Sequence, residues 1–316
     1  MNDYVNDSGL LDVGDGHQIY WEDWGNPNGA PIISIHGGPG GSFSDTHKAL
    51  FDPAKHHVIF HDQRGCGRSL PFASTENNTT QDLIHDIELL REKFEFETVN
   101  IIGGSWGSSL SLLYTIEHPD RVSNLLLWGI YLIRQFETDW VNEGYPRYNF
   151  PAEWDRFIAL VPEEYRTNGE SIMKYYAKQI RSTDAEIVKK YAFEWSLWES
   201  ALLSINYDPA TSIQEVANDP HTLSTAILET HYFTNKCFVA ENYILNNIDK
   251  IRHIPCKVIQ GRFDMCTPAI GAYDLAKAYG ENLTLNWVNS GHLRSDPGMH
   301  ELIKACAEEL RVTNAI

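Results

Sequence analysis

The stretch Gly103-Gly104-Ser105-Trp106-Gly107 lies between two patterns that predict different secondary structures. Residues 99–104, immediately before the serine, form an apolar run that is typical of a buried strand. Residues 106–117 follow with a helical pattern, which His118-Pro119 ends. Small residues on both sides of Ser105 let a sharp strand-to-helix turn close without a Cβ clash. The stretch therefore predicts a tight turn that presents the Ser105 hydroxyl at the N-terminus of a helix.

Further strand patterns occur on both sides of this motif, at residues 17–24, 31–36, 57–62, 123–128, 256–260 and 283–288. The earliest are candidates for antiparallel hairpins, whereas the later ones are apolar at consecutive positions, as buried parallel strands are. Helices are expected at residues 79–94, where Thr79 and Asp82 resemble a capping box, and at about 298–312. This alternation predicts an α/β fold with a mostly parallel central sheet and helices on both faces.

The pattern changes in the middle of the chain. Residues 134–248 are rich in aromatic and acidic side chains, show helical periodicity and contain no strong strand pattern. We therefore expect a helical cap domain at 134–248, inserted into a sheet domain made of residues 1–133 and 249–316.

Ser105 needs partners if it is to act as a nucleophile, because a serine hydroxyl reacts poorly until a base removes its proton. The G-x-S-x-G pattern is that of the nucleophile elbow in α/β-hydrolases, where an acid and then a histidine follow the serine in the chain. Asp264 and His292 have this order, and each follows a predicted strand. Because the carboxyl ends of parallel strands meet at one edge of a sheet, the three side chains are expected to lie together.

Other residues compete for these two roles. The chain has 13 histidines, but His231 lies in the expected insertion, His253 precedes a strand and His300 lies in the last helix. Asp296 is the rival carboxylate, although it follows the histidine instead of preceding it. Asp264 and His292 remain the preferred pair, because both lie at strand ends on the same edge as Ser105.

Two backbone N–H groups are expected to stabilise an oxyanion. One belongs to Trp106, the residue after the nucleophile. The other belongs to the glycine loop His36-Gly37-Gly38-Pro39-Gly40-Gly41, where Gly38 is preferred and Gly37 is the rival. A second motif, Asp62-Gln63-Arg64-Gly65-Cys66-Gly67-Arg68-Ser69, is interpreted as a hydrogen-bonded turn that shapes one wall of the site.

Composition narrows the choice of partners. The formal net charge of −18 makes nucleic acid and anionic membrane surfaces poor partners. No apolar run approaches the roughly 20 residues of a membrane helix, and the sequence begins without a signal-peptide pattern. The five cysteines are widely spaced without a C-x-x-C motif, so reduced thiols and a cytoplasmic location are expected. We expect no metal and no cofactor, since neither H-E-x-x-H nor a phosphate-binding loop is present.

Together, the His36–Gly41 loop, the Asp62–Ser69 motif and the Gly103–Gly107 motif resemble those of proline iminopeptidases, which are prolyl aminopeptidases of the α/β-hydrolase superfamily. The resemblance runs over nearly the whole chain. It implies that Ser105, Asp264 and His292 form a catalytic triad and that the substrates are short peptides with a free N-terminal proline. The implied reaction releases that proline through an acyl-enzyme intermediate.

The resemblance also gives the expected insertion a role in substrate binding. The segments Trp195-Ser196-Leu197-Trp198-Glu199 and Glu229-Thr230-His231-Tyr232-Phe233 resemble the two family segments whose glutamates hold the substrate's α-amino group. Tyr131 falls where the family commonly has phenylalanine, and Phe233 matches a family phenylalanine, so both are expected to line the proline pocket. Two positions depart from the family pattern: Asn142 stands where tyrosine is frequent, and Cys266 lies one place earlier than in some relatives.

Two other functions remain open from the residues alone. A related esterase or amidase could use the same triad on another small acyl compound, and a binding protein could keep the scaffold without chemistry. The glutamates separate the first alternative from an aminopeptidase, because an ester substrate has no ammonium group to bind. The intact set of Ser105, Asp264 and His292 argues against the second.

Overall fold

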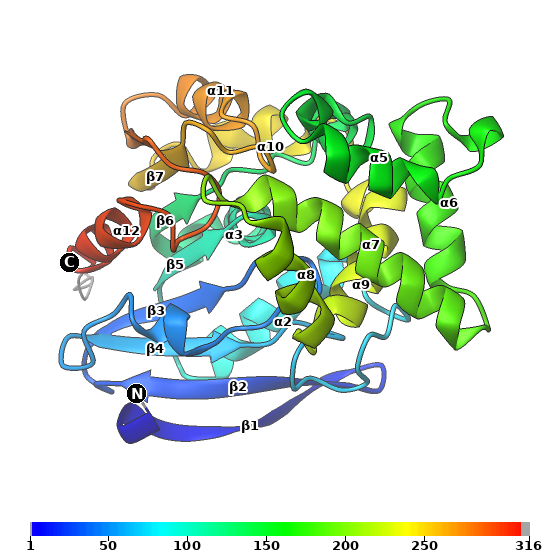
Figure 1. Cartoon of the computed structure of the whole chain (residues 1–316). Coiled ribbons are helices and arrows are strands. Elements are labelled where there is room, and N and C mark those ends of the chain that lie inside the picture. The colour runs from blue at the N-terminus through cyan, green and yellow to red at the C-terminus, as the bar shows by residue number, and fades with distance from the viewer. Residues whose placement is uncertain (1, 311–316) are drawn as a thin grey trace.

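The computed structural model describes residues 2–310, which form one eight-stranded sheet with helices on both faces (Figure 1). The strands are β1 Val5–Gly14, β2 His17–Gly25, β3 Ala30–Ile35, β4 His56–His61, β5 Val99–Gly104, β6 Val122–Trp128, β7 Cys256–Gly261 and β8 Leu283–Val288. Their order in the sheet is β1-β2-β4-β3-β5-β6-β7-β8. Strands β3 to β8 are parallel to one another, and β2 is antiparallel to both β1 and β4. The predicted α/β fold with a mostly parallel sheet is confirmed.

The helices fall into three groups along the chain. Those before β6 are α1 Asp45–Lys48, α2 Thr80–Lys93 and α3 Trp106–Glu117. Those between β6 and β7 are α4 Gln135–Asn142, α5 Pro151–Ala159, α6 Gly169–Ile180, α7 Ala185–Leu203, α8 Pro209–Asn218, α9 Thr222–Thr234 and α10 Tyr243–Asn246. The last two are α11 Ile270–Tyr279 and α12 Met299–Ala307. Short 3₁₀ turns lie at Asn2–Tyr4, Pro119–Arg121, Tyr145–Tyr148, Glu163–Tyr165, Lys236–Phe238 and Ile248–Lys250.

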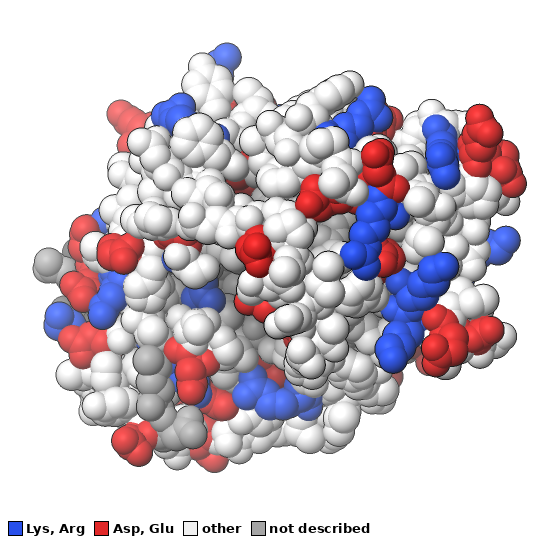
Figure 2. Space-filling view, viewed as in Figure 1, with Lys and Arg blue, Asp and Glu red and all other residues white. Residues whose placement is uncertain are grey.

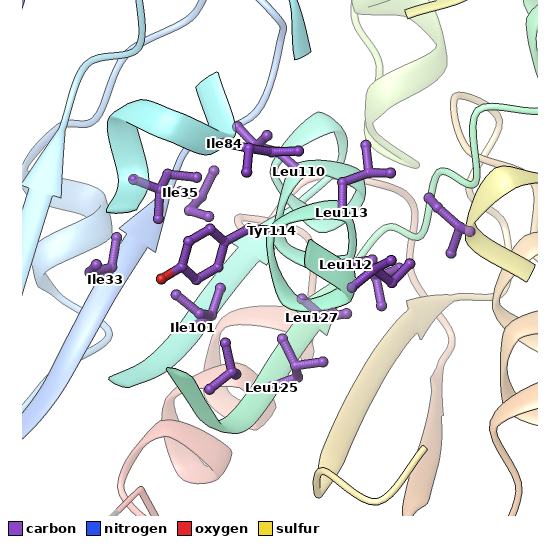
Figure 3. Packing of buried hydrophobic residues seen from close by; sticks show 14 of the residues in the cluster. Ile33, Ile35, Ile84, Ile101, Leu110, Leu112, Leu113, Tyr114, Leu125 and Leu127 are labelled. Carbon is purple, nitrogen blue, oxygen red and sulfur yellow. The ribbon is translucent and has the colours of Figure 1, made fainter. Parts of the chain in front are cut away.

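Alternate residues of the parallel strands pack into two separate apolar cores. Ile101 of β5 belongs to the core that contains α2, α3 and α11, whereas its neighbour Ile102 belongs to the core that contains α12. Figure 3 shows the first core, in which Ile33, Ile101 and Leu127 meet Leu110 and Tyr114 of α3. Burial on both faces explains why these strands are apolar at consecutive positions.

The helices between β6 and β7 have a core of their own, made mainly of aromatic side chains. Phe157 of α5 stacks on Tyr176 of α6 with ring centres 4.4 Å apart, and Trp195 and Trp198 of α7 pack beside them. In Figure 1, α5 to α9 lie together toward the right of the view, and β1 and β2 lie at the bottom of the molecule. Ser224 of α9 donates a hydrogen bond of 2.8 Å to the carbonyl of Gly40, so these helices reach the loop after β3.

Two expectations from the sequence were wrong in detail. Strand β1 was not predicted, because its segment contains two glycines and two aspartates and shows only weak alternation. The last helix ends at Ala307 and does not continue to Val312, a residue that lies outside the described part of the chain. Glu308 and Glu309 follow Ala307 directly, and acidic side chains are unfavourable at a helix C-terminus.

Charged side chains are spread over the face of the molecule that Figure 2 shows. Red acidic groups and blue basic groups alternate there, with white surface between them, and neither colour forms one continuous field. The net charge of −18 is therefore not gathered into a single acidic patch on this face.

We expect Ile101→Ala to lower the free energy of unfolding by about 2–5 kcal/mol, because it leaves a cavity at a fully buried position. Leu10→Ala on β1 is the matched control, since Leu10 is 44% exposed, and it should cost less than about 1 kcal/mol. Urea denaturation of both variants measures the difference. Equal losses would contradict the assignment of β5 to the centre of the core.

Candidate active site

Ser105 lies at the turn between β5 and α3 in a strained backbone conformation, with φ 57° and ψ −130°. The flanking glycines are required by close backbone contacts. A Cβ atom on Gly103 would lie 2.4 Å from the carbonyl oxygen of Gly107, and one on Gly107 would lie 2.4 Å from that of Ile35. The predicted sharp turn is therefore present, and side chains at these two positions would force it apart.

Asp264 and His292 are in direct contact. Asp264 follows β7, His292 follows β8, and Oδ2 of the aspartate lies 2.7 Å from Nδ1 of the imidazole. Four further groups hold the carboxylate: the backbone N–H and hydroxyl of Thr267, at 2.7 and 2.8 Å, the backbone N–H of Cys266, at 3.0 Å, and the side-chain amide of Gln260, at 3.1 Å. This contact fixes the imidazole so that its Nε2 is the nitrogen left for a reacting group.

Ser105 and His292 both lie close to Gly129. A Cβ atom on Gly129 would lie 2.8 Å from Cε1 of His292 and 3.5 Å from the backbone nitrogen of Ser105. Within residues 2–310, the Ser105 hydroxyl makes no hydrogen bond, including to His292. The three predicted residues are thus brought to one place, without a hydrogen bond between Ser105 and His292 within residues 2–310.

The local charges set the protonation of His292. Burial alone would lower its pKa, but the nearby negative charge of Asp264, its hydrogen bond, and the charges of Glu199 and Asp296 outweigh burial. The pKa of His292 is therefore raised above its ordinary value. A raised pKa suits a general base, because the imidazole then binds a proton more strongly.

Asp296, the rival carboxylate, has a different set of partners. It accepts hydrogen bonds from the Ser204 hydroxyl at 2.6 Å and from the backbone N–H of Gly291 at 2.8 Å. Asp296 thus ties the loop that carries His292 to the end of α7, while Asp264 makes the direct contact with the imidazole.

A cavity opens beside the serine. Ser105, Gly38 and Trp106 line it from the sheet side, and Glu199 and Glu229 line it from α7 and α9. Tyr131, Phe233, Asn142 and Cys266 also line it, so every residue predicted for substrate binding or for the oxyanion faces the same space. His292 and Asp264 are not among its lining residues.

The predicted oxyanion donors are suitably placed for that role. Trp106 is the first residue of α3, so its N–H has no carbonyl one turn back in the helix. Gly38 has a φ of 122°, and within residues 2–310 its N–H makes no hydrogen bond. The rival, Gly37, is also close, because a Cβ atom on it would lie 3.3 Å from Cβ of Ser105. The choice between the two glycines stays a prediction.

The Asp62–Ser69 motif makes hydrogen bonds to residues that form the site. Gln63 accepts a hydrogen bond of 2.9 Å from the indole N–H of Trp106 and donates one of 2.9 Å to the carbonyl of His36. Arg68 pairs with the buried Asp62 at 2.7 Å. Cys66 is buried, which raises its thiol pKa, and it does not line the cavity. The interpretation as a hydrogen-bonded turn agrees with these contacts.

Glu199 and Glu229 both line the cavity. Glu229 is almost fully buried, and its Oε2 accepts a hydrogen bond of 2.6 Å from the indole N–H of Trp195. Burial raises the pKa of Glu199, and burial together with the charge of Glu199 raises the pKa of Glu229 further. Two carboxylates held together in this way favour any cation that enters, because it relieves their repulsion.

Aromatic side chains form the neighbouring wall. Tyr131 and Phe233 meet edge to face, with ring centres 6.0 Å apart and an interplanar angle of 79°. Asn142 donates a hydrogen bond of 2.8 Å to the carbonyl of Thr138, while its buried Oδ1 has no partner within residues 2–310. The wall is thus mainly apolar, with one unpaired acceptor at the position that departs from the family pattern.

Some supporting residues were not predicted from the sequence. Gln260, Thr267 and Trp195 orient Asp264 or Glu229 through hydrogen bonds. The close spacing of Thr267 to Asp264 is the one local signal that could have suggested such a role. In the described part of the chain, no group of His, Cys, Asp or Glu side chains is arranged to hold a metal, and all five cysteines are free. Nor is any helix there long and apolar enough to cross a membrane.

The fold and the site define a class of protein that comparison confirms. A family model described as the alpha/beta hydrolase fold matches residues 30–295. The proline iminopeptidase of Neisseria gonorrhoeae is 42% identical over 96% of each chain, and that of Arabidopsis thaliana is 40% identical over 96% of this chain and 80% of its own. The chain belongs to the proline iminopeptidase family of α/β-hydrolases.

Solved structures agree on the fold. The proline iminopeptidase-related protein of Thermus thermophilus has a TM-score of 0.62 and covers 96% of each chain at 17% identity. A putative aryl esterase from Burkholderia cenocepacia has a TM-score of 0.64 at 16% identity, covering 96% of this chain and 97% of its own. At such low identity these likenesses show a shared scaffold only.

We expect Asp264→Asn to lower the pKa of His292, because the substitution removes the negative charge that opposes the effect of burial. NMR titration of the imidazole measures the shift. Asp296→Asn is the matched control and should lower the pKa less, since Asp296 contributes the weakest of the four raising effects. An unchanged or higher pKa in Asp264→Asn would contradict the assigned contact.

Proposed function

We propose that this protein is a serine aminopeptidase that releases N-terminal proline from short peptides through an acyl-enzyme intermediate. The observation that carries the proposal is the acid pair of half-buried Glu199 and buried Glu229, in the same cavity as Ser105. A serine hydrolase that acts on neutral esters has no use for such a pair, whereas a free α-amino group is cationic near neutral pH. Relatives at about 40% identity that are named proline iminopeptidases support the same activity.

The proposed reaction uses Ser105, His292 and Asp264 in two stages. The Ser105 Oγ attacks the carbonyl carbon of proline while its proton passes to Nε2 of His292, and the carbonyl oxygen becomes an alkoxide. The N–H groups of Gly38 and Trp106 stabilise that negative charge. The C–N bond then breaks as the imidazolium gives its proton to the leaving amine, which leaves a prolyl ester on Ser105.

Water completes the cycle. It attacks the ester carbon while His292 removes its proton, and the alkoxide forms again in the same place. When this second intermediate collapses, the proton returns to the Ser105 Oγ and free proline leaves. Asp264 stays ionised throughout and stabilises the imidazolium in both stages.

The acid pair and the aromatic wall give the proposed specificity. Glu199 and Glu229 bind the prolinium nitrogen by charge-assisted hydrogen bonds, and Tyr131 and Phe233 pack against the apolar ring. A residue attached before proline would place a neutral amide where the carboxylates require a cation. The same contacts therefore make the enzyme an exopeptidase.

The proposed catalytic and substrate-binding roles belong to different segments of the chain. Residues 1–133 and 249–316 form the catalytic domain with the nucleophile, acid and base, while residues 134–248 form a cap domain that contributes both glutamates and Phe233. Support comes from the separate aromatic core of α5, α6 and α7.

We expect Glu229→Gln to lower kcat/KM for proline naphthylamide by roughly 10²-fold, taking one lost charge contact as about 3 kcal/mol. Wild-type enzyme should hydrolyse this substrate and leave N-acetylproline naphthylamide intact, because acetylation removes the cation. A steady-state assay of both compounds measures these differences. Glu215→Gln, on the exposed side of α8, is the matched control and should resemble wild type.

Equal rates on the two substrates would refute the amine-binding role and favour a general esterase or amidase. A panel of other N-terminal residues in the same assay establishes the preference for proline. Complete inactivity of the wild-type enzyme on every substrate of the panel would refute the proposed activity itself.

A further inference from the structure

None of the residues discussed so far has been assigned to bind the part of the peptide that follows the scissile bond. Under the proposed function, His292 gives its proton to the leaving nitrogen, so the residue after proline lies on the His292 side of Ser105. In a dipeptide, the C-terminal carboxylate is only two bonds from that nitrogen. A dipeptide would thus bring a negative charge close to the loop that carries His292.

Arg294 lies on that loop, two residues after His292, which places their Cα atoms within about 7 Å of each other. Its Nη1 donates to the carbonyl oxygen of Thr46 at 3.2 Å, and its Nη2 donates to the Thr46 hydroxyl at 3.2 Å. Its Cζ lies 5.7 Å from the ring centre of Trp128, the strand-end residue whose carbonyl accepts the backbone N–H of Ser105. The guanidinium therefore stands between the loop after β3 and the loop after β8.

The neighbourhood of His47 supports this placement. Burial lowers the pKa of His47, and the positive charges of Arg294 and then His36 lower it further. His36 begins the glycine loop that contains Gly38. Arg294 and His36 thus both lie close enough to His47 to affect its pKa, which places Arg294 near the start of the glycine loop.

The charge of Arg294 has no opposite charge to balance it. Within residues 2–310, no carboxylate oxygen lies within 4.0 Å of its guanidinium, and both of its hydrogen-bond partners are neutral. Burial lowers the pKa of Arg294 to about 10, so the group still carries its proton at neutral pH. Asp296, two residues away, is occupied by Ser204 and Gly291.

Other arginines of the chain have different partners. Arg64 contacts Asp86 at 2.7 Å, and Arg134 contacts Asp274 at 2.7 Å. Arg181 also lacks a carboxylate, but it follows α6 and bonds to the carbonyl of Ala177, where the negative end of the helix dipole supports it. Arg294 is half-exposed, so its unpaired positive charge, beside the loop that carries His292, is accessible to an anionic group of the substrate.

We propose that Arg294 binds the C-terminal carboxylate of a dipeptide substrate and makes prolyl dipeptides the preferred class. A guanidinium binds a carboxylate through two parallel N–H donors. This contact holds the second residue of the dipeptide and thereby positions the leaving amine. The proposal rests on the aminopeptidase activity proposed above. A side-chain carboxylate on the second residue has the same chemistry, and the substrates below separate the two sources.

The test compares kcat/KM for Pro-Ala with that for Pro-Ala amide, which differ only in the terminal charge. Wild-type enzyme should prefer the free acid by roughly tenfold or more, and Arg294→Gln should bring the ratio close to one. Arg294→Lys keeps the charge without the planar pair of donors and should retain a reduced preference. Arg262→Gln is the matched control, because Arg262 is an exposed arginine that packs on Trp287, and it should keep the wild-type ratio.

A merely structural contact between Arg294 and Thr46 predicts a different result: both substrates would slow equally in Arg294→Gln, and the ratio would survive. That result, or equal wild-type rates on acid and amide, would overturn the proposal. A preference for Pro-Glu amide over Pro-Ala amide without a preference for free acids would overturn the assignment to the C-terminal carboxylate. Failure of the proposed activity is distinct, because wild-type enzyme would then leave proline naphthylamide intact.

Discussion

Parallel pairing of the central strands is the constraint that brings the site together. Ile35 of β3 pairs with Gly103 of β5, and Gly104 of β5 pairs with Trp128 of β6. Trp128 in turn pairs with Ile259 of β7, so neighbouring strands end at nearly the same level. Each loop that follows a strand must then leave at the same edge of the sheet. Residues far apart in the sequence meet there because the sheet gives their loops no other exit.

The contact between Asp264 and His292 depends on that constraint and on the groups around it. Thr267 and Gln260 hold the carboxylate, and Asp296 holds the loop that carries the histidine. Each supporting hydrogen bond removes freedom from one partner before substrate arrives. The strained conformation of Ser105 has the same purpose, because it presents the hydroxyl at the start of α3 in a fixed direction.

Without a bound cation, the acid pair in the cavity is electrostatically unfavourable. Two buried carboxylates repel each other and lose their hydration, so their pKa values rise and the pair binds protons as well as substrate amines. A cationic amine removes both penalties at once. Aromatic side chains that also line the cavity lower its local polarity, which strengthens this attraction. Specificity and binding then come from the same interaction.

Much of this arrangement could be predicted from the sequence. Ser105, Asp264 and His292 each follow a parallel strand, and chain order together with strand position was enough to predict that they lie at one edge of the sheet. The acids Glu199 and Glu229 could be interpreted only through the family resemblance, because isolated glutamates on helices are usually exposed. Trp195 and Arg294 act through contacts with residues that are distant in the sequence, which no local pattern reports, whereas the short spacing of Thr267 from Asp264 is a local signal. Strand β1 was missed because an edge strand with two glycines carries little apolar alternation.

The nucleophilic role of Ser105 is tested most directly by stopping the enzyme during turnover of proline p-nitrophenyl ester. Acid quenching followed by mass spectrometry of the intact protein and its peptides locates any acyl group. We expect one prolyl group on the peptide that contains Ser105 and none in Ser105→Ala. A prolyl group on another residue, or rapid turnover by Ser105→Ala, would contradict the role assigned to this serine.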